Sequence, residues 1–508
     1  MIQPTATSAS SPEATPPSAP SASPGSARSL ELLCVLSLVF VLPSARLWLS
    51  SPLILTQHEF DYWLGLFAFL GPTFNPLAVL VGRALHLAGF LVLGLLFCPV
   101  ARAALAGEDV GSVRRTVKLA TILALVWTLG MPWVSPDVFF YIATGWLDVH
   151  YHLSPYLHGL FEASGATTDP MFSNVVPPFM KGTTAYGPLF QLVARAVAML
   201  SGGSQLVALG LYKLIALAAH AANGALLWRL APLARRQAAL LFYCCNPLVL
   251  FSLLTCAHND GLMMTFVLAA LVSRNAARPG LAGAMLGCGV AVKYAPIILL
   301  PLFVVDLCAS GDAPWSRRIL AIGRFGLGLA AALVAFHLLY PESLSGFLHV
   351  ATGGIGVYRN SIYHVLIALT GKMPLPPITR QILNGAFAVA AVAATLIFWR
   401  EALRTRRFRL SEACLLIWSL YFVLPNQTNQ EWYLAWLLAL VAVVPLAAVE
   451  GLGLRLSLLF MPLVIFTVRN APVTNFAANV LLYLLLAGSV VAALPSLLFP
   501  KPPPEPAR

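Results

Sequence analysis

The sequence predicts an all-α polytopic membrane protein, and three features lead to this fold class. Hydrophobic residues make up 59% of the 508 residues, and the mean hydropathy is +0.82. Charged residues make up 10%, against about 25% in soluble domains, so the chain could not cover a water-facing surface. Apolar stretches approaching the roughly 20 residues that a helix needs to span a bilayer recur along the chain.

A single transmembrane region, residues 29–498, is predicted between two short tails. Residues 1–28 are Ser, Pro and Ala with almost no charge, which predicts a disordered tail because such a segment buries little apolar surface. It lacks the basic start and apolar core of a signal peptide. Residues 499–508 form a second, Pro-rich tail. We expect no separate soluble domain.

The apolar stretches predict about 13–14 membrane helices. Several are short, which is tolerated when they are buried among other helices or when the bilayer thins. Residues 280–308 are expected to form two half-length helices meeting near Lys293, because Pro296 breaks the helical hydrogen-bond ladder. Residues 188–201, with Arg195 at their centre, are expected to be re-entrant or interfacial. The candidate spans are approximately 30–50, 76–100, 116–134, 205–228, 237–256, 260–274, 280–292, 295–309, 319–340, 380–400, 409–425, 431–449, 454–469 and 473–497.

Basic residues predict the orientation, because they collect in cytoplasmic loops. With these spans, all basic clusters fall on one side, which we expect to be the cytoplasm and to hold both termini. The chain is therefore predicted to be a multi-pass protein of a bacterial plasma membrane. The net charge of +12 is read as a topology signal, and no nucleic-acid partner is expected. The basic clusters are at 114–118, 229–236, 274–278, 317–318 and 400–409.

Unusual polar residues lie in the opposite, outer loops. The longest weakly hydrophobic interval, residues 135–186, opens with Asp137 directly after a predicted helix. Ionisable residues at a membrane edge are functional candidates because their desolvation is costly. A carboxylate would take a proton from a hydroxyl, cations would hold a phosphate, and aromatic rings would stack on sugars. The other outer clusters are His258-Asn259-Asp260, Lys293, Arg359-Asn360 and the polar-aromatic turn at 426–433.

Five motifs in order resemble those of the C-fold (GT-C) glycosyltransferases, which are polytopic enzymes that use polyprenyl-phosphate sugars. Within that group the chain is most similar to the polyprenol-phosphate-mannose-dependent α-1,6-mannosyltransferases. Glu431 departs from the Pro that this family has at that position. The motifs are DVFFY from Asp137, YGPLF from Tyr186, HNDGLM from His258, AVKYAP from Ala291 and EWYLAW from Glu431.

The resemblance implies a GT-C-like helix bundle with helical outer-face loops and an inverting transfer at the outer membrane face. A hexose, expected to be mannose, would pass from a polyprenyl phosphate to a hydroxyl of a glycan or glycolipid. Asp137 matches the position of the family's catalytic base. Lys293 and Arg359 are predicted to clamp the phosphate, and Asp260 and His258 to position the sugar or acceptor. The remaining predicted substrate-binding residues are Tyr186, Asn360, Trp432 and Tyr433.

Each of these residues also has a structural interpretation. Asp137 and Asp260 would serve as helix caps, and Lys293 as a lysine that extends to the membrane surface. Trp432 and Tyr433 fit an aromatic belt. Glu59 and Asp61 are a rival acid pair that we interpret as an interfacial turn.

No resident cofactor or metal is expected, although the sequence does not exclude the use of a divalent cation. His150, His152 and His158, with Asp148, are spaced so that they would allow a zinc site, but loop histidines are more often solvated.

Two rival functions stay open. A transporter or lipid flippase would also have broken helices and intramembrane charges. The charges here cluster at one face and the two halves show no repeat, which favours the transferase. A same-fold enzyme that uses another lipid-linked sugar, such as a pentose, is equally compatible with the sequence.

Overall fold

A computed structural model describes most of the chain. The described residues are 24–45, 76–132, 135, 137–166, 168–175, 177–309, 311–352, 360–373, 375–467 and 472–499. Every regular element in them is a helix, which confirms the predicted all-α fold class. Helix α1 begins at Pro24, inside the range predicted as the N-terminal tail. Apart from this helix start and Phe499, the predicted tails lie outside the described residues, as do Glu59 and Asp61.

Prolines mark many of the helix starts, because the ring fixes a helical φ where the missing N–H costs nothing. Short helices outside the α class are the 3₁₀ helices η3 (Leu160–Glu162), η4 (Pro170–Phe172), η5 (Leu233–Arg235), η7 (Ala295–Leu299) and η8 (Glu431–Tyr433), and the π-helix η6 (Phe251–Thr255). The α-helices are α1 (Pro24–Ala45), α3 (Pro76–Leu105), α4 (Val113–Leu129), α5 (Asp137–His150), α6 (Pro177–Met180), α7 (Pro188–Ser201), α8 (Gln205–Leu230), α9 (Arg236–Cys244), α10 (Pro247–Leu250), α11 (Asp260–Asn275), α12 (Pro279–Val292), α13 (Leu300–Ala309), α14 (Trp315–Leu339), α15 (Ser343–Thr352), α16 (Ile362–Thr370), α17 (Pro377–Thr405), α18 (Leu410–Val423), α19 (Leu434–Val441), α20 (Ala447–Thr467) and α21 (Pro472–Leu498).

Five helices in the described residues are long and apolar enough to cross a membrane, and a sixth span is counted if a pair bent by 51° is one span. The sequence predicts about 13–14 spans. Much of the difference comes from apolar helices of 10–17 residues, which at 1.5 Å per residue are too short to cross about 30 Å of hydrocarbon alone. The five are Leu87–Leu105, Gln205–Leu230, Trp315–Leu339, Pro377–Thr405 and Phe476–Leu498, and the bent pair is Leu233–Cys244 with Pro247–Thr255.

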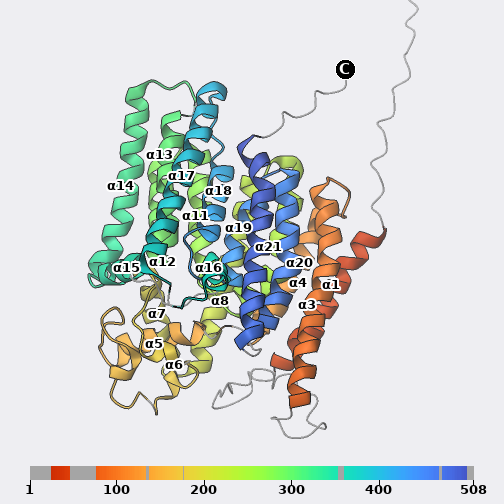
Figure 1. The fold of residues 1–508 in the computed structure, drawn as a ribbon, viewed down its shortest axis with the longest axis vertical. Helices are drawn as coiled ribbons and strands as arrows, with labels where there is room; N and C mark the ends of the chain where they lie inside the picture. The colour runs from red at the N-terminus through yellow and green to blue at the C-terminus, as the bar shows by residue number, and fades with distance from the viewer. Residues whose placement is uncertain are drawn as a thin grey trace, which may run out of the picture.

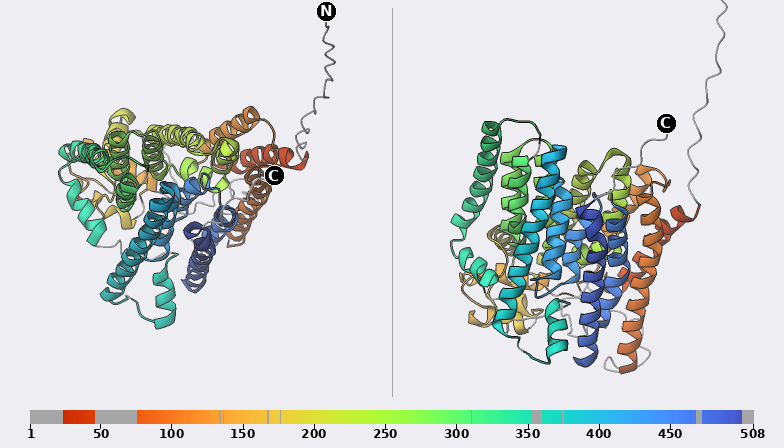
Figure 2. Two further views of the ribbon diagram at one scale, coloured as in Figure 1. Left: turned by 90° about the horizontal axis from the view of Figure 1, so that it is seen from above. Right: turned by 45° about the horizontal axis from the view of Figure 1, so that its top comes forward.

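The long helices run roughly side by side in one bundle, with α14 at one edge and α1 and α3 at the other (Figure 1). The segment that contains α5 and α6 packs against the lower end of this bundle in Figure 1, and the tilted view of Figure 2 keeps it there. Only 6% of the apolar window of helix α14 is buried, as expected for a helix with a lipid-facing side. It approaches α12 closely where Gly328 meets the Gly280 backbone.

Different segments of the chain contact the two ends of helix α4. At the Val113 end, Gln237 donates to the Gly111 carbonyl at 2.7 Å, and Arg235 donates to the Leu105 carbonyl. At the other end, the α4 C-cap Gly130 lies against Thr255 of η6. These ends are called the Arg235 end and the Asp137 end. The predicted break at Lys293 is confirmed, since α12 ends at Val292 and helical structure resumes at Ala295.

Candidate active site

Asp137 is the first residue of α5, where the helix dipole favours a carboxylate. Its side chain is 13% exposed. One carboxylate oxygen, Oδ2, accepts a hydrogen bond from the Tyr186 hydroxyl at 3.5 Å and lies 3.7 Å from Nδ1 of His258. The structure therefore joins Asp137 to two further residues predicted for the site, from segments 49 and 121 positions away in the chain.

Tyr186 is held by its own backbone as well as by its ring. Its carbonyl accepts hydrogen bonds from the hydroxyls of Tyr156 at 3.0 Å and Tyr294 at 3.3 Å. Its ring packs edge-on against Tyr141, with 5.0 Å between centroids. Burial, followed by the nearby Asp137 carboxylate, raises the pKa of the Tyr186 hydroxyl well above its usual value of 10.0. Tyr186 is therefore a protonated donor toward Asp137 at neutral pH.

A glycine after Tyr186 brings α7 onto the end of α12. The Gly187 N–H donates to the Val292 carbonyl at 3.0 Å, and a Cβ at this position would overlap the Ala291 carbonyl. Pro188 then begins α7. The YGPLF motif thus has a physical basis: the tyrosine reaches Asp137, the glycine allows the close approach and the proline starts the helix.

His258 lies in a strained turn between η6 and α11. The preceding residue, Ala257, has φ +52°, a left-handed conformation that costs a non-glycine residue energy and often marks a functional site. The fully buried imidazole stacks on Trp432 with 3.8 Å between ring centroids. Its Nδ1 lies 3.5 Å from the Tyr141 hydroxyl as well as near Asp137.

The imidazole of His258 is neutral at physiological pH. Burial lowers its pKa well below the usual value of 6.5, and the Lys293 cation lowers it further. The 3.7 Å approach to Asp137 is therefore a polar contact and not an ion pair. With a proton on Nδ1 the imidazole would donate toward Asp137 and leave Nε2 as an acceptor.

Asp260 and Lys293 form the second half of the cluster. Oδ1 of Asp260 accepts hydrogen bonds from Lys293 Nζ at 2.8 Å and from Trp436 Nε1 at 2.7 Å. The Lys293 ammonium group lies 4.3 Å from the Tyr433 ring centre and 5.4 Å from that of Trp436, both within cation–π range. Asp260 is completely buried, whereas the Lys293 side chain is 15% exposed. The exposed part of this pair is thus the cation.

Several buried polar atoms beside this cluster have no hydrogen-bond partner among the described residues. They are Nε2 of His258, Oδ2 of Asp260 and both amide atoms of Asn259. Buried polar atoms are almost always paired, so three consecutive residues with open valences need an explanation. Together with the partly exposed Lys293 and the Trp432, Tyr433 and Trp436 rings, they offer hydrogen-bonding atoms for hydroxyl groups, one cation and aromatic rings.

The turn that carries Trp432 and Tyr433 is fixed by asparagines. Asn360 Nδ2 donates to the Asn429 carbonyl at 3.0 Å, and Asn429 Nδ2 donates back to the Asn360 carbonyl at 2.8 Å. The structure thus places Asn360, a predicted substrate contact, in a reciprocal pairing with the turn. The neighbouring Arg359, predicted as a phosphate ligand, lies outside the described residues.

The other acids of residues 135–186 take part in local structure. Asp148 accepts from the Tyr340 hydroxyl, and Asp169 accepts from Trp146 Nε1 at 2.9 Å and the Tyr151 hydroxyl at 2.7 Å. Glu162 pairs with His158 at 2.7 Å on the surface. Asp137 is therefore the described acid of this segment that faces His258.

The three histidines of this segment lie in separate settings. His158 pairs with Glu162, His150 stacks on Trp146 at 4.5 Å, and His152 has φ +55°. Among the described residues no group of three His, Cys, Asp or Glu side chains is arranged to hold a metal ion.

Sequence reasoning missed four residues that build the site: Tyr141, Asn259, Asn429 and Trp436. Tyr141 and Trp436 were inside quoted motifs, four residues after Asp137 and Trp432. A spacing of four places two side chains on one helix face, and this signal would have found both. Asn259 and Asn429 lie inside the predicted polar clusters at 258–260 and 426–433, but the sequence gives no signal for their individual roles. The role of Asn429 depends on its pairing with Asn360, 69 residues away.

Comparisons with known proteins identify the family to which the chain is similar. Residues 56–309, half of the chain, match the family model described as alpha-(1->6)-mannopyranosyltransferase, N-terminal domain. The chain is 32% identical over 169 residues to a probable alpha-(1->6)-mannopyranosyltransferase of Mycolicibacterium smegmatis, covering 30% of this chain and 29% of that protein. It is 26% identical over 415 residues to alpha-(1->6)-mannopyranosyltransferase A of Mycobacterium tuberculosis, covering 74% of each. No solved structure matches the chain.

Proposed function

The chain belongs to the alpha-(1->6)-mannopyranosyltransferase family, and from this premise we propose that it is a membrane enzyme that transfers mannose. The donor in the proposal is a polyprenyl-phosphate mannose, and the acceptor is a hydroxyl of a glycan or glycolipid. The Asp137 end would face the outside of the plasma membrane, and the basic loops at the Arg235 end would face the cytoplasm.

The observation that carries the proposal is the connection between Asp137 and Lys293. Asp137 lies beside His258, and two residues later in the chain Asp260 binds Lys293. A proton acceptor and a cation thus lie in one buried cluster, as transfer of a sugar from a lipid phosphate requires.

In the proposed reaction Asp137 takes the proton of the acceptor hydroxyl as its oxygen attacks the anomeric carbon. The bond from that carbon to the phosphate oxygen breaks, and the configuration at the carbon inverts. The Tyr186 hydroxyl and His258 orient the Asp137 carboxylate through their contacts with Oδ2. His258 Nε2 and Asp260 Oδ2, which lack partners among the described residues, would bind sugar hydroxyls.

Lys293 would stabilise the leaving polyprenyl phosphate. One of its three N–H groups is used by Asp260, which leaves two donors for phosphate oxygens. A cation near the developing charge lowers the barrier, because the interaction strengthens as the bond breaks.

The proposed function is tested with membranes that contain the protein, labelled polyprenyl-phosphate mannose and a mannan acceptor. We expect Asp137→Asn to lower transfer by about 10²–10⁴-fold, the range for a general base. The control is Glu162→Gln, which removes a surface carboxylate from the same outer segment and should keep wild-type activity. Equal rates in the wild type and Asp137→Asn would remove Asp137 from its proposed role.

A further inference from the structure

Lys213 is a buried cation that the mechanism above does not use. It lies in α8, and only 2% of the residue is exposed. An ammonium group has three N–H donors, and the Lys213 ammonium meets three backbone carbonyls. It donates to Gly130 at 2.5 Å, to Leu254 at 2.8 Å and to Thr255.

The three carbonyls belong to two helix ends that converge on one point. Gly130 is the C-cap of α4, and Leu254 and Thr255 are the last two residues of the π-helix η6. The last carbonyls of a helix lack partners within it, and its C-terminus carries partial negative charge. One buried cation therefore satisfies both ends, and two helix termini that would otherwise repel each other are held together.

Other contacts tie the same two ends. The Thr255 hydroxyl donates to the Trp127 carbonyl at 2.7 Å. Gly130 packs so tightly that a Cβ there would lie 2.9 Å from the Thr255 hydroxyl oxygen. The junction of α4, η6 and Lys213 is thus closely packed and allows little adjustment.

Each of the two ends is close in sequence to a residue of the candidate active site. Seven residues after Gly130 the chain reaches Asp137, and three residues after Thr255 it reaches His258. The neighbour of Lys213, Tyr212, also packs against Tyr141 of α5, with 5.8 Å between ring centroids. Helix α8 therefore contacts α5, which begins with Asp137, and η6, which precedes His258 in the chain.

We propose that Lys213 is a positioning residue, which fixes His258 relative to Asp137 by binding the ends of α4 and η6 together. This inference rests on the proposed mannose transfer. Lys213 does not contact Asp137 or His258 directly, so its effect is on geometry. A displacement of about 1 Å of a catalytic group costs up to about 10²-fold in rate.

The first test is Lys213→Met, which keeps an unbranched side chain slightly shorter than that of lysine and removes the three donors. On protein purified in detergent and normalised to the folded fraction, we expect kcat to fall by about 10–100-fold. The dissociation constant for polyprenyl-phosphate mannose should stay within about twofold, because Lys293 and Asp260 are unchanged. Wild-type kcat per folded molecule would show that Lys213 acts only on folding, and the proposal would be wrong.

A matched control separates positioning from general loss of stability. Asn246 caps α10 at the start of the same 247–255 segment, where its Nδ2 donates to the Ser457 hydroxyl at 2.8 Å. Asn246→Ala should lower the melting temperature and leave kcat per folded molecule unchanged. An equal loss of kcat in Asn246→Ala and Lys213→Met would contradict a specific role for Lys213.

Two milder variants keep the proposal testable if Lys213→Met does not fold. Thr255→Val removes the bond to Trp127, and Gly130→Ala pushes η6 away from α4. Both should lower kcat without weakening donor binding, and Gly130→Ala should do so more strongly. Wild-type kcat in both would overturn the proposal.

Hydrogen exchange distinguishes this proposal from the proposed function. In whichever of the three variants folds, amides of residues 256–262 and 137–142 should exchange faster than in the wild type. If the wild type transfers no mannose, the proposed function is wrong. The hydrogen-exchange rates then test the positioning role of Lys213 without a measurement of activity. Unchanged exchange in both segments would then overturn the positioning role.

Discussion

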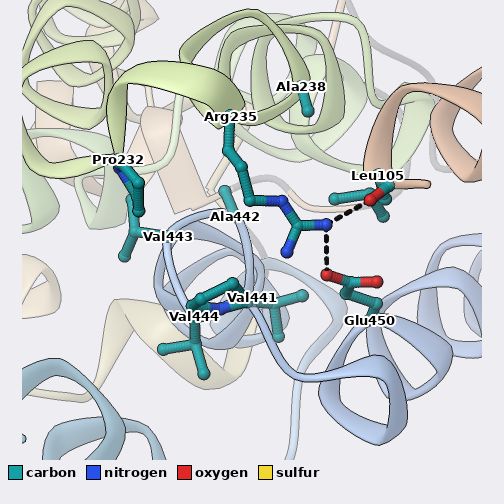
Figure 3. Close-up of a pocket in the computed structure, with 10 residues that line it drawn as sticks. Leu105, Pro232, Arg235, Ala238, Val441, Ala442, Val443, Val444 and Glu450 are labelled. Atoms are coloured by element: carbon teal, nitrogen blue, oxygen red, sulfur yellow. Dashed lines mark hydrogen bonds and ion pairs between the residues drawn. The ribbon is translucent and has the colours of Figure 1, made fainter. Parts of the chain in front are cut away.

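The ion pairs at the two ends of α4 have different surroundings. At the Arg235 end, Arg235 binds Glu450 at 2.6 Å and the Leu105 carbonyl (Figure 3). Its surroundings are apolar, and residues 441–444 line the recess beside it. At the Asp137 end, the ion pair of Lys293 and Asp260 adjoins His258 and Asn259, whose polar atoms lack partners among the described residues.

We infer from this comparison that the ion pair at the Arg235 end stabilises the fold, whereas the polar groups at the Asp137 end bind a substrate. Arg235 joins α3, η5 and α20, and its guanidinium meets a carboxylate and a carbonyl. The Asp137 end retains open valences and a strained residue, Ala257, which lower stability unless a substrate compensates. We therefore expect substitutions at the Asp137 end to affect transfer, and those at the Arg235 end to affect stability.

After Asp137, the largest effect on transfer is expected at Lys293. Lys293→Met removes the proposed phosphate contact and should lower kcat/KM by about 10²–10³-fold, as loss of a transition-state charge contact does. It also leaves Asp260 as a buried carboxylate without its cation, which costs about 3–5 kcal/mol of stability. Transfer assays and thermal melting in detergent measure the two effects.

A double variant distinguishes these two effects. Lys293→Met with Asp260→Asn leaves no uncompensated charge, so the melting temperature should recover most of its loss. Transfer should stay low, because no cation faces the phosphate. Recovery of transfer together with stability would mean that Lys293 only balances Asp260.

A smaller effect is expected at Tyr186. Tyr186→Phe keeps the ring packing against Tyr141 and removes the hydroxyl that donates to Asp137 at 3.5 Å. We expect kcat to fall by about tenfold, the effect of a hydrogen bond worth about 1–1.5 kcal/mol, because this bond to a carboxylate is long. Tyr151→Phe is the matched control, since its hydroxyl donates to the carboxylate of Asp169 and not to Asp137. An unchanged kcat in Tyr186→Phe would show that Asp137 needs no orienting hydroxyl.

At the Arg235 end, a substitution should change stability alone. Arg235→Met leaves Glu450 without its cation, and we expect a loss of about 1–3 kcal/mol because both side chains are partly exposed. The melting temperature should fall while kcat per folded molecule stays within about twofold of the wild type. A tenfold loss of kcat would remove the distinction between the two ends.

The smallest effect is a pH dependence of stability from His258. Its pKa is lowered in the folded protein, so the unfolded chain binds a proton more readily below about pH 6.5. The stability from this group is present above pH 6.5 and is lost as the pH falls. The melting temperature should therefore fall more steeply between pH 7 and 5 in the wild type than in His258→Phe. Parallel curves would show that His258 is not buried as a neutral imidazole.

Much of the candidate site could be predicted because its residues lie at ends of apolar segments. Asp137, Tyr186, His258, Asp260 and Lys293 each follow or precede a hydrophobic stretch, and the predicted sidedness put all five on one face. The partners within the cluster could not be predicted. That Lys293 binds Asp260, and that Trp436 binds the same oxygen, depends on how α11, α12 and α19 pack.

The fold class was predictable from composition, whereas the length of the helices was not. Apolar residues alone do not show where a helix breaks inside the membrane, as at the bend between Leu233–Cys244 and Pro247–Thr255. The role of Lys213 could not be predicted from the sequence either. In the sequence it is one lysine within an apolar helix, and its three carbonyl partners come from two distant segments.

The most direct test measures transfer and melting for Asp137→Asn and Arg235→Met in parallel, at equal folded fractions. The account predicts a loss of kcat of at least about 10²-fold with an unchanged melting temperature for Asp137→Asn. For Arg235→Met it predicts a lower melting temperature with wild-type kcat. Wild-type transfer by folded Asp137→Asn protein would contradict the account.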